Sequence, residues 1–382
     1  MPATPGIDPV PLLTDLIRCP SVTPETAGVL DVLEAALTQL GFACTRLTFE
    51  GDGSYPVENL FATRGTTGKH LLFAGHTDVV PPGDTAAWRH PPFAAEIVDG
   101  TLYGRGAADM KSGIAAFLAA ISRVPEAGRI SLAITNDEEA DAVNGTDKLM
   151  AWAEAQGHRF DFAIVGEPSA TARVGDSIKV GRRGSLNGQI RVTGTQGHVA
   201  YPDKANNPLP VAAALIGALS GKLDDGTEHF PPSNLEFTSA DVGNETTNVI
   251  PASVLLRFNV RYNDRWTPQT LLGAVNEVIG NQDAHGTVIA FTVVGRPSRS
   301  FLSPLGGGVK MLVETIARRT GIAPELSTGG GTSDARFIAE YCPVVEFGLP
   351  GPSMHKVDES VRVADVEELT ALYARFITDY FA

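Results

Sequence analysis

The chain has 382 residues, more than the roughly 250–300 at which one hydrophobic core stops growing, so we expect two domains. Hydrophobic residues make up 43% of the chain and charged residues 19%, which excludes a disordered protein. The formal net charge of -14 argues against nucleic acid as a partner, because a phosphate backbone is bound through clustered Lys and Arg. It does not exclude an anionic small substrate, which needs only a local basic pocket.

The cysteines and the N-terminus indicate the compartment. Cys19, Cys44 and Cys342 lie far apart and lack the spacing of a zinc knuckle, so we predict reduced thiols. Residues 1–8 show no signal-peptide pattern, and the longest apolar stretch, around residues 114–121, is too short to span a bilayer. We therefore expect a cytoplasmic protein that does not bind membranes.

Four short apolar runs predict buried parallel strands, and helical patterns lie between or beside them. The predicted strands are residues 71–74, 130–135, 162–165 and 344–347. The predicted helices are residues 27–40, 113–121, 147–155, 308–319 and 366–380. This alternation is typical of an α/β fold, with a mixed, mostly parallel sheet covered by helices.

The pattern changes between about residues 183 and 296. The predicted order there is strand, helix, strand, strand, helix, strand, at residues 186–192, 210–223, 235–242, 249–262, 268–279 and 287–294. This βαββαβ order is that of an α+β ferredoxin-like unit. We predict a catalytic domain of residues 1–182 and 297–382, with residues 183–296 inserted as a second domain.

Side chains of the types that bind metal ions follow each of the four predicted strands. Open α/β sheets bind ligands beyond the carboxyl ends of their strands, so these side chains are expected to converge. The candidates after the strands are His76, Asp78, Glu138, Glu139, Glu167 and His355, and a further candidate, Asp109, lies just before the predicted helix of residues 113–121.

Each candidate taken alone also has a structural explanation. A histidine after a strand is often only hydrogen-bonded, Asp109 could cap a helix, and Glu138 with Glu139 could form a surface turn. Their joint occurrence at strand ends favours metal binding. Two histidines with three or four carboxylates suit two divalent ions about 3.5–4 Å apart, and imidazole favours zinc or cobalt over magnesium. We expect two Zn²⁺, replaceable by Co²⁺, and a hydrogen bond from the free ring nitrogen of His76 to Asp78.

The segments GHTDVVPPG, GRGAADMKSG, TNDEEA and GEPS, followed by His355, resemble the full motif set of the M20 metallopeptidase family, in family order. The resemblance implies that Asp109 bridges the two metal ions. It also implies that His76 and Glu167 complete one site, and Glu139 and His355 the other.

The resemblance leaves Glu138 as the general base, which would take a proton from water and later deliver it to the leaving amine. Spacing alone leaves open the alternative in which Glu138 and Glu139 exchange roles. Ala140, after the paired glutamates, departs from the glycine common in the family.

His198, in the segment GTQGHVAYP, lies in the predicted insert. In the resembling family the corresponding histidine crosses a dimer interface and stabilises the oxyanion of the tetrahedral intermediate. The resemblance therefore implies a homodimer in which His198 is catalytic. The alternative is a histidine of a surface loop.

The segments VGDSIKVGRRGSLNGQI, STGGGTSDARFIA and MHKVDESV closely resemble the desuccinylases of the family. This implies hydrolysis of N-succinyl-LL-2,6-diaminopimelate to succinate and LL-2,6-diaminopimelate, in lysine and diaminopimelate biosynthesis. Guanidinium groups bind carboxylates in a bidentate manner, so Arg182, Arg183 and Arg261 are candidates for substrate binding. Gly330 and Thr332 are further candidates, while pairing of the arginines with the protein's own acids is the alternative.

Two other functions remain open from the sequence. One is another M20 amidohydrolase, such as an acetylornithine deacetylase or a dipeptidase. The other is a metal-binding protein without turnover. Glu138 separates the last alternative from an enzyme, because metal ligation does not require this residue and hydrolysis does.

Overall fold

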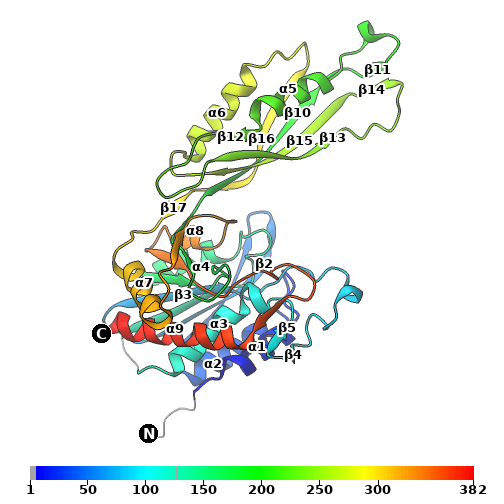
Figure 1. The fold of residues 1–382 in the computed structure, drawn as a ribbon. Coiled ribbons are helices and arrows are strands. Elements are labelled where there is room, and N and C mark those ends of the chain that lie inside the picture. The colour runs from blue at the N-terminus through cyan, green and yellow to red at the C-terminus, as the bar shows by residue number, and fades with distance from the viewer. Residues whose placement is uncertain (1–5, 126–127) are drawn as a thin grey trace. The chain divides into compact units, whose positions relative to one another are not determined.

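The computed structural model describes residues 6–125 and 128–382. These residues form two compact units, which are described separately (Figure 1). Unit 1 contains the described residues up to Val180 with Ser303–Ser327 and Ser333–Ala382, and unit 2 contains Gly181–Leu302 and Thr328–Thr332. Among the described residues, no helix has the length and apolar character needed to cross a bilayer.

Unit 1 is built around an eight-stranded sheet with the order β1-β2-β6-β3-β7-β19-β8-β18. The strands are β1 (Ala43–Gly51), β2 (Ser54–Arg64), β3 (His70–His76), β6 (Arg129–Thr135), β7 (Phe162–Val165), β8 (Ser177–Lys179), β18 (Glu325–Ser327) and β19 (Val344–Glu346). The four predicted strands, β6, β3, β7 and β19, are neighbours and run parallel. β1, β2 and β6 pair antiparallel, as do β8 and β19, so the mixed sheet of the prediction is confirmed.

The central strands are buried along their whole length because helices cover both faces of the sheet. All seven residues of β3 and all four of β7 are buried. Helices α1, α3, α7 and α9 pack together on one face, whereas α4 and α8 pack on the other (Figure 1). The helices are α1 (Pro9–Arg18), α2 (Val29–Gln39), α3 (Ser112–Ser122), α4 (Thr146–Ala155), α7 (Gly307–Thr320), α8 (Ala335–Ile338) and α9 (Val363–Phe381).

The register of the parallel strands sets the level at which their functional residues appear. His76, the last residue of β3, lies opposite Thr135 of β6, and Ala74 lies opposite Val165 of β7. The residues that follow these strands therefore emerge at one edge of the sheet. A small separate sheet, β20-β5-β4, is formed by β4 (Glu96–Val98), β5 (Thr101–Tyr103) and β20 (Ser360–Arg362).

Unit 2 contains an antiparallel sheet with the order β12-β13-β15-β10-β16. Its strands are β12 (Gly221–Lys222), β13 (Asn234–Asp241), β15 (Ser253–Tyr262), β10 (Gly184–Thr193) and β16 (Val288–Ser298), and its helices are α5 (Leu209–Leu219) and α6 (Pro268–Gly280). The predicted βαββαβ order is confirmed. Buried and exposed residues alternate along β10, as expected for a sheet with one face under helices.

One glycine of unit 2 is required by packing. The ring of Phe258 lies across Gly188 of β10, where an added Cβ would come within 2.3 Å of the ring. Phe258 belongs to the core between the sheet and the two helices. Cys19, Cys44 and Cys342 all lie in unit 1 and form no disulfide, in agreement with the prediction of reduced thiols.

Candidate metal centre

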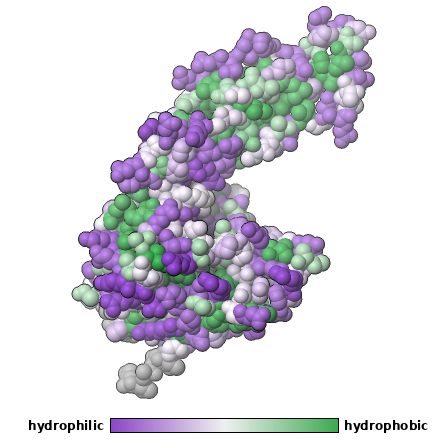
Figure 2. Space-filling model, in the orientation of Figure 1, coloured by the Kyte–Doolittle hydropathy of each residue, from purple (hydrophilic) through white to green (hydrophobic). Residues whose placement is uncertain are grey.

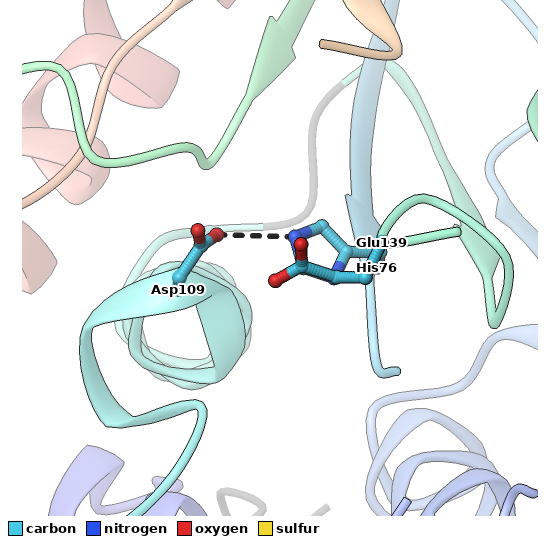
Figure 3. A group of neighbouring side chains, drawn as sticks. All are labelled: His76, Asp109 and Glu139. Carbon is cyan, nitrogen blue, oxygen red and sulfur yellow. Dashed lines mark hydrogen bonds and ion pairs between the residues drawn. The ribbon is translucent and has the colours of Figure 1, made fainter. Parts of the chain in front are cut away.

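The ring of His76 has a defined orientation. It is buried, with 1% of its surface exposed, and its Nδ1 lies 2.9 Å from the backbone carbonyl of Asp78. A carbonyl only accepts, so Nδ1 carries the proton and donates it. The other nitrogen, Nε2, faces Asp109 Oδ1 at 3.1 Å (Figure 3). It also lies 3.6 Å from Glu167 Oε1. This tautomer leaves Nε2 available to bind a metal ion.

Asp78 acts on the site differently from the expected contact. Its carboxylate Oδ1 lies 3.6 Å from the ring nitrogen of His76, beyond hydrogen-bond distance, while its backbone carbonyl accepts that bond. The carboxylate instead accepts the amide N–H groups of Glu138 at 3.2 Å and Glu139 at 3.0 Å, and the hydroxyl of Thr23 at 2.9 Å. Asp78 therefore orients the histidine through its backbone and the two glutamates through its side chain.

Asp109 presents its two carboxylate oxygens to two different histidines. It lies in the short segment η2 (Ala107–Lys111), where its own backbone is extended rather than helical, and 6% of its surface is exposed. Oδ1 is 3.1 Å from His76 Nε2, and Oδ2 is 3.2 Å from His355 Nε2. His355 Nε2 is also 3.0 Å from Glu139 Oε1. A carboxylate that faces two imidazoles in this way is suited to bridge two cations.

The potential ligand atoms form two overlapping groups within the described residues. His76, Asp109 and Glu139 offer ligand atoms within 4.8 Å of one another, as do His76, Glu138 and Glu167. Glu138 thus lies as close to His76 as a ligand would. The positions leave open which of the two adjacent glutamates binds metal, as the spacing in the sequence did.

Buried negative charge dominates the electrostatics of this centre. Hydrogen bonds from His355 to Asp109 and Glu139 raise the pKa of His355 to about 10. Burial opposes the charge on His76, but its hydrogen bonds with Asp109 and Asp78 outweigh burial and raise its pKa well above the usual value. Cations would replace these protons, because metal binding requires neutral imidazole and ionised carboxylates. The donor set of imidazole nitrogens and carboxylate oxygens therefore fits two divalent metal ions.

Glu138 differs from the other carboxylates of the centre. Its pKa is raised well above the usual value, first because burial removes water and second because Glu167 lies nearby. The negative charge of Asp334 also raises the pKa of Glu138. A carboxylate with a raised proton affinity, held beside metal-binding groups, has the property that a general base needs.

Two acidic residues that support this centre, Asp137 and Asp334, were not among the residues predicted from the sequence. Asp137 accepts the amides of Val143 and Asn144 at 2.9 and 3.0 Å and the hydroxyl of Tyr55 at 2.6 Å, which fixes the loop that carries the paired glutamates. Asp334 is buried, and accepts the hydroxyl of Thr146 at 2.6 Å. Asp137 and Asp334 stood inside the quoted motifs, but acids that bind backbone or hydroxyl donors have no spacing signature.

The remaining predicted residues belong to unit 2. His198 lies in β11 (Gly197–His198), is exposed, and accepts the amide of Ala200 at 3.1 Å through Nδ1. Arg182, in β9 (Gly181–Arg182), donates to the carbonyl of Gly329 at 3.0 Å. Arg182 therefore lies beside the glycine-rich segment that contains Gly330 and Thr332.

The other two candidate arginines, Arg183 and Arg261, also lie in unit 2. Arg183 donates to the carbonyl of Pro232 at 3.1 Å and to Asn234 Oδ1 at 3.0 Å, and burial lowers its pKa. Arg261 lies in β15 opposite Ser185 and Asn234 of the neighbouring strands. These contacts fix the position of the Arg183 side chain within unit 2.

Known proteins resemble this chain over the region that contains these motifs. The model of peptidase family M20/M25/M40 matches residues 72–379. This chain is a member of the M20/M25/M40 peptidase family. Among M20 relatives, the succinyl-diaminopimelate desuccinylase of Rhodopseudomonas palustris (strain BisA53) is 53% identical over 392 residues, covering 100% of both chains.

Two further M20 relatives extend the comparison. The succinyl-diaminopimelate desuccinylase of Rhodospirillum centenum (strain ATCC 51521 / SW) is 53% identical over 382 residues, covering 98% of both chains. The M20 family metallo-carboxypeptidase Sso-CP2 from Sulfolobus solfataricus superimposes with a TM-score of 0.80 at 17% identity, covering 98% of this chain and 99% of its own. The fold of the family is therefore present throughout the described chain.

Proposed function

We propose that this M20 enzyme hydrolyses the amide bond of N-succinyl-LL-2,6-diaminopimelate to succinate and LL-2,6-diaminopimelate, in lysine and diaminopimelate biosynthesis. The observation that carries the proposal is the 53% identity, over essentially whole chains, to two relatives named succinyl-diaminopimelate desuccinylase. That similarity covers the metal centre and the segments of unit 2 together. The lack of any membrane-spanning helix among the described residues agrees with our proposal of a cytoplasmic enzyme.

The residues of unit 1 suggest how the reaction proceeds. We propose that His76 and Glu167 would hold one Zn²⁺ and Glu139 and His355 a second, with Asp109 shared between the two ions and Co²⁺ able to replace them. Such ions supply Lewis acidity, which polarises the amide carbonyl and acidifies water. Glu138 then accepts a proton from water while the oxygen of that water attacks the carbonyl carbon of the amide. The C–N bond breaks, and Glu138 delivers the proton to the leaving amine nitrogen.

The dimer is a separate proposal, supported by the surface of unit 2. The outward face of α5 consists of small residues, Ala213, Ala214, Gly217 and Ala218, all exposed. Figure 2 shows hydrophobic residues gathered at the surface around this helix. The edge strand β16 also exposes Val288 and Val294, by 66% and 47%. Exposed apolar surface beside an open sheet edge favours association with a second copy of the chain.

The proposed dimer gives His198 its role. We propose that residues 183–296 form the dimerisation domain and that His198 of one subunit stabilises the oxyanion in the active site of the other. Residues 1–182 and 297–382 form the metal-binding domain in this proposal. The proposed substrate carries carboxylate groups. We propose that it is bound by Arg182, Arg183, Arg261, Gly330 and Thr332.

Assays on one metal-analysed sample test the substrate. The protein, loaded with Zn²⁺ or Co²⁺, is given succinyl-diaminopimelate, acetylornithine and a dipeptide under identical conditions. We expect the highest kcat/KM for succinyl-diaminopimelate, loss of activity with a chelator, and recovery with two equivalents of metal. A preference for acetylornithine or the dipeptide would reject the substrate assignment while leaving the two-metal hydrolase intact.

A further inference from the structure

A buried ion pair lies directly behind the metal centre, and the mechanism above does not use it. Arg105 Nη1 is 2.6 Å from Glu359 Oε2. Arg105 is 2% exposed and Glu359 is 0% exposed. The guanidinium also lies over the ring of Trp88, 5.2 Å from its centroid. Because the pair is shielded from water, both side chains are held in one position.

Glu359 uses its second oxygen to hold the backbone that carries Asp109. Oε1 accepts the amide N–H groups of Ala108 at 2.9 Å and Asp109 at 3.1 Å. The backbone carbonyl of Glu359 also accepts the amide of Gly104 at 2.8 Å. One residue therefore fixes the segment 104–109 at several points, with the bridging carboxylate at its end.

The same residue stands at the foot of the loop that carries His355. Ser353 and Ser360 close this loop with two hydrogen bonds, from Ser353 Oγ to the carbonyl of Ser360 at 2.9 Å and from the amide of Ser360 to Ser353 Oγ at 3.1 Å. His355 reaches from the loop back to Asp109 Oδ2, at 3.2 Å. The path from Asp109 through Glu359 and the loop to His355 is thus a closed ring of contacts.

We propose that Glu359 is a positioning residue which, with Arg105, holds the bridging carboxylate of Asp109 and the loop of His355 in one rigid frame and so sets the geometry of the two metal sites. The inference rests on the proposed two-metal function. Groups behind metal ligands usually change metal affinity by about 10–100-fold when they are removed. Asp109 serves both ions but His355 only one, so we expect the loss to be larger for one equivalent than for the other.

The test must separate positioning from plain stability. Removing Glu359 alone would leave Arg105 buried without its partner, whereas replacing both residues of a buried ion pair by apolar side chains is often neutral for stability. The main variant is therefore the double substitution Arg105→Met/Glu359→Leu. Glu359→Gln serves as a second variant, because it keeps an oxygen for the two amides. The matched control is Arg319→Met/Glu368→Leu, which removes an ion pair of 2.7 Å at the surface.

Metal-free protein is titrated with Co²⁺ in the absence of substrate, and the visible absorption spectrum and stoichiometry are recorded beside the apo melting temperature. We expect the double variant to fold but to bind one equivalent at least about 10-fold more weakly, with an altered Co²⁺ spectrum. Glu359→Gln should lie between the double variant and wild type, and the control should match wild type.

Wild-type Co²⁺ affinity and spectrum in either folded Glu359 variant would overturn the positioning role. Because the titration uses no substrate, this outcome is independent of the desuccinylase assignment, which only the substrate comparison can reject. Failure of wild-type protein to bind two equivalents of Co²⁺ would instead reject the two-metal function itself.

Discussion

At the scale of single residues, the adjacent Glu138 and Glu139 occupy different environments. Glu139 is 3.0 Å from His355, as a ligand of the same ion would be. Glu138 has a raised pKa because of burial and of the charge on Glu167. Both amides are held by the carboxylate of Asp78, so the different surroundings of the two side chains lie beyond a shared backbone position.

Glu138→Gln tests the proposed base. The amide cannot accept a proton from water, so we expect kcat to fall by about 2–4 orders of magnitude with metal content unchanged. Metal analysis and steady-state kinetics on one preparation measure both quantities. Glu139→Gln is the matched comparison and should lose metal at one site. If Glu138→Gln lost metal and Glu139→Gln kept it, the two roles would be exchanged.

The residues of the metal centre differ in how far sequence could predict them. His76, Glu167 and His355 could be found because metal-binding residue types follow buried strands. Glu359 could not be found as a support of Asp109, since it lies 250 positions away and acts through backbone amides. Any sequence can supply an amide, so such a contact leaves no pattern in the residue types. For the same reason, the sequence could predict a hydrogen bond from His76 to Asp78 but not that the backbone carbonyl of Asp78 would accept it.

At the scale of secondary structure, β3 begins and ends with a buried histidine, and the pKa values of the two histidines are shifted in opposite directions. His76 ends the strand in the metal centre. His70 begins it with 1% of its surface exposed, its Nδ1 2.7 Å from the carbonyl of Arg159. Burial, with a smaller contribution from the charge of Arg129, lowers the pKa of His70 to about 4.

His70 predicts a pH dependence of stability. The unfolded chain takes up a proton near pH 6.5 and the folded chain only near pH 4, so the contribution is complete above pH 6.5 and is lost as the pH falls toward 4. The full contribution of His70 to the free energy of unfolding is up to about 3 kcal/mol. In His70→Asn, we expect the fall in the unfolding free energy of metal-free protein between pH 7 and pH 4 to be correspondingly smaller. Denaturant titrations at several pH values measure it. His285→Asn, at an exposed histidine, should behave as wild type, and equal slopes in all three proteins would contradict the prediction.

Helix α3 approaches the end of β7 so closely that only glycine fits at the contact. A Cβ on Gly113 would lie 2.2 Å from the carbonyl oxygen of Gly166, which precedes Glu167. Gly113→Ala must shift the helix or that ligand segment. We expect a loss of about 1–3 kcal/mol in unfolding free energy, typical of overpacking, and weaker metal binding.

The control for this substitution is Gly273→Ala in α6. Nothing lies within 4 Å of a Cβ there, so the change should stabilise the protein by roughly 0.5–1 kcal/mol through helix propensity. Thermal unfolding and Co²⁺ titration of both variants provide the comparison. A Gly113→Ala protein as stable as Gly273→Ala would show that α3 can move freely.

The elements that could be predicted from the sequence have a clear hydrophobic pattern, either a continuous apolar run or a regular alternation. The continuous apolar runs of β3, β6 and β7 indicate strands buried on both faces, and the alternation along β10 and β15 indicates a half-covered sheet. The hairpin of β1 and β2 was missed because β1 is half exposed and has no regular alternation. β8 and β18 have three residues each, too few for any period.

At the scale of the whole molecule, the proposed dimer makes each active site depend on two chains. Ala214→Arg places a charge on the apolar face of α5. We expect a monomer by analytical ultracentrifugation, with metal content retained and activity largely lost because His198 must come from a partner. Gln269→Arg, which adds the same charge to exposed surface on α6, is the control. A fully active monomer would contradict the shared site.

Mixing two inactive variants tests the shared site more directly. In a hybrid of His198→Ala with Glu138→Gln, one active site has both wild-type residues and the other has neither. After subunits are exchanged at random, roughly a quarter of wild-type activity should return, because half of the dimers are hybrids with one working site each. No recovery in hybrids shown to form would place His198 and Glu138 in the same subunit's site.

The two points that bound the main segment of unit 2, Gly181–Leu302, are neighbours. In unit 1 the amide of Ser303 donates to the carbonyl of Val180 at 2.8 Å, and in unit 2 Gly181 pairs with Leu302. The main segment of unit 2, Gly181–Leu302, therefore leaves and re-enters unit 1 at a single place, and the short segment Thr328–Thr332 joins unit 2 separately. A gene segment encoding such an insert can be gained, lost or exchanged by recombination without rerouting the host fold. Residue 180 joined directly to residue 303 should leave the catalytic scaffold continuous, ready to accept a different insert with a different partner surface.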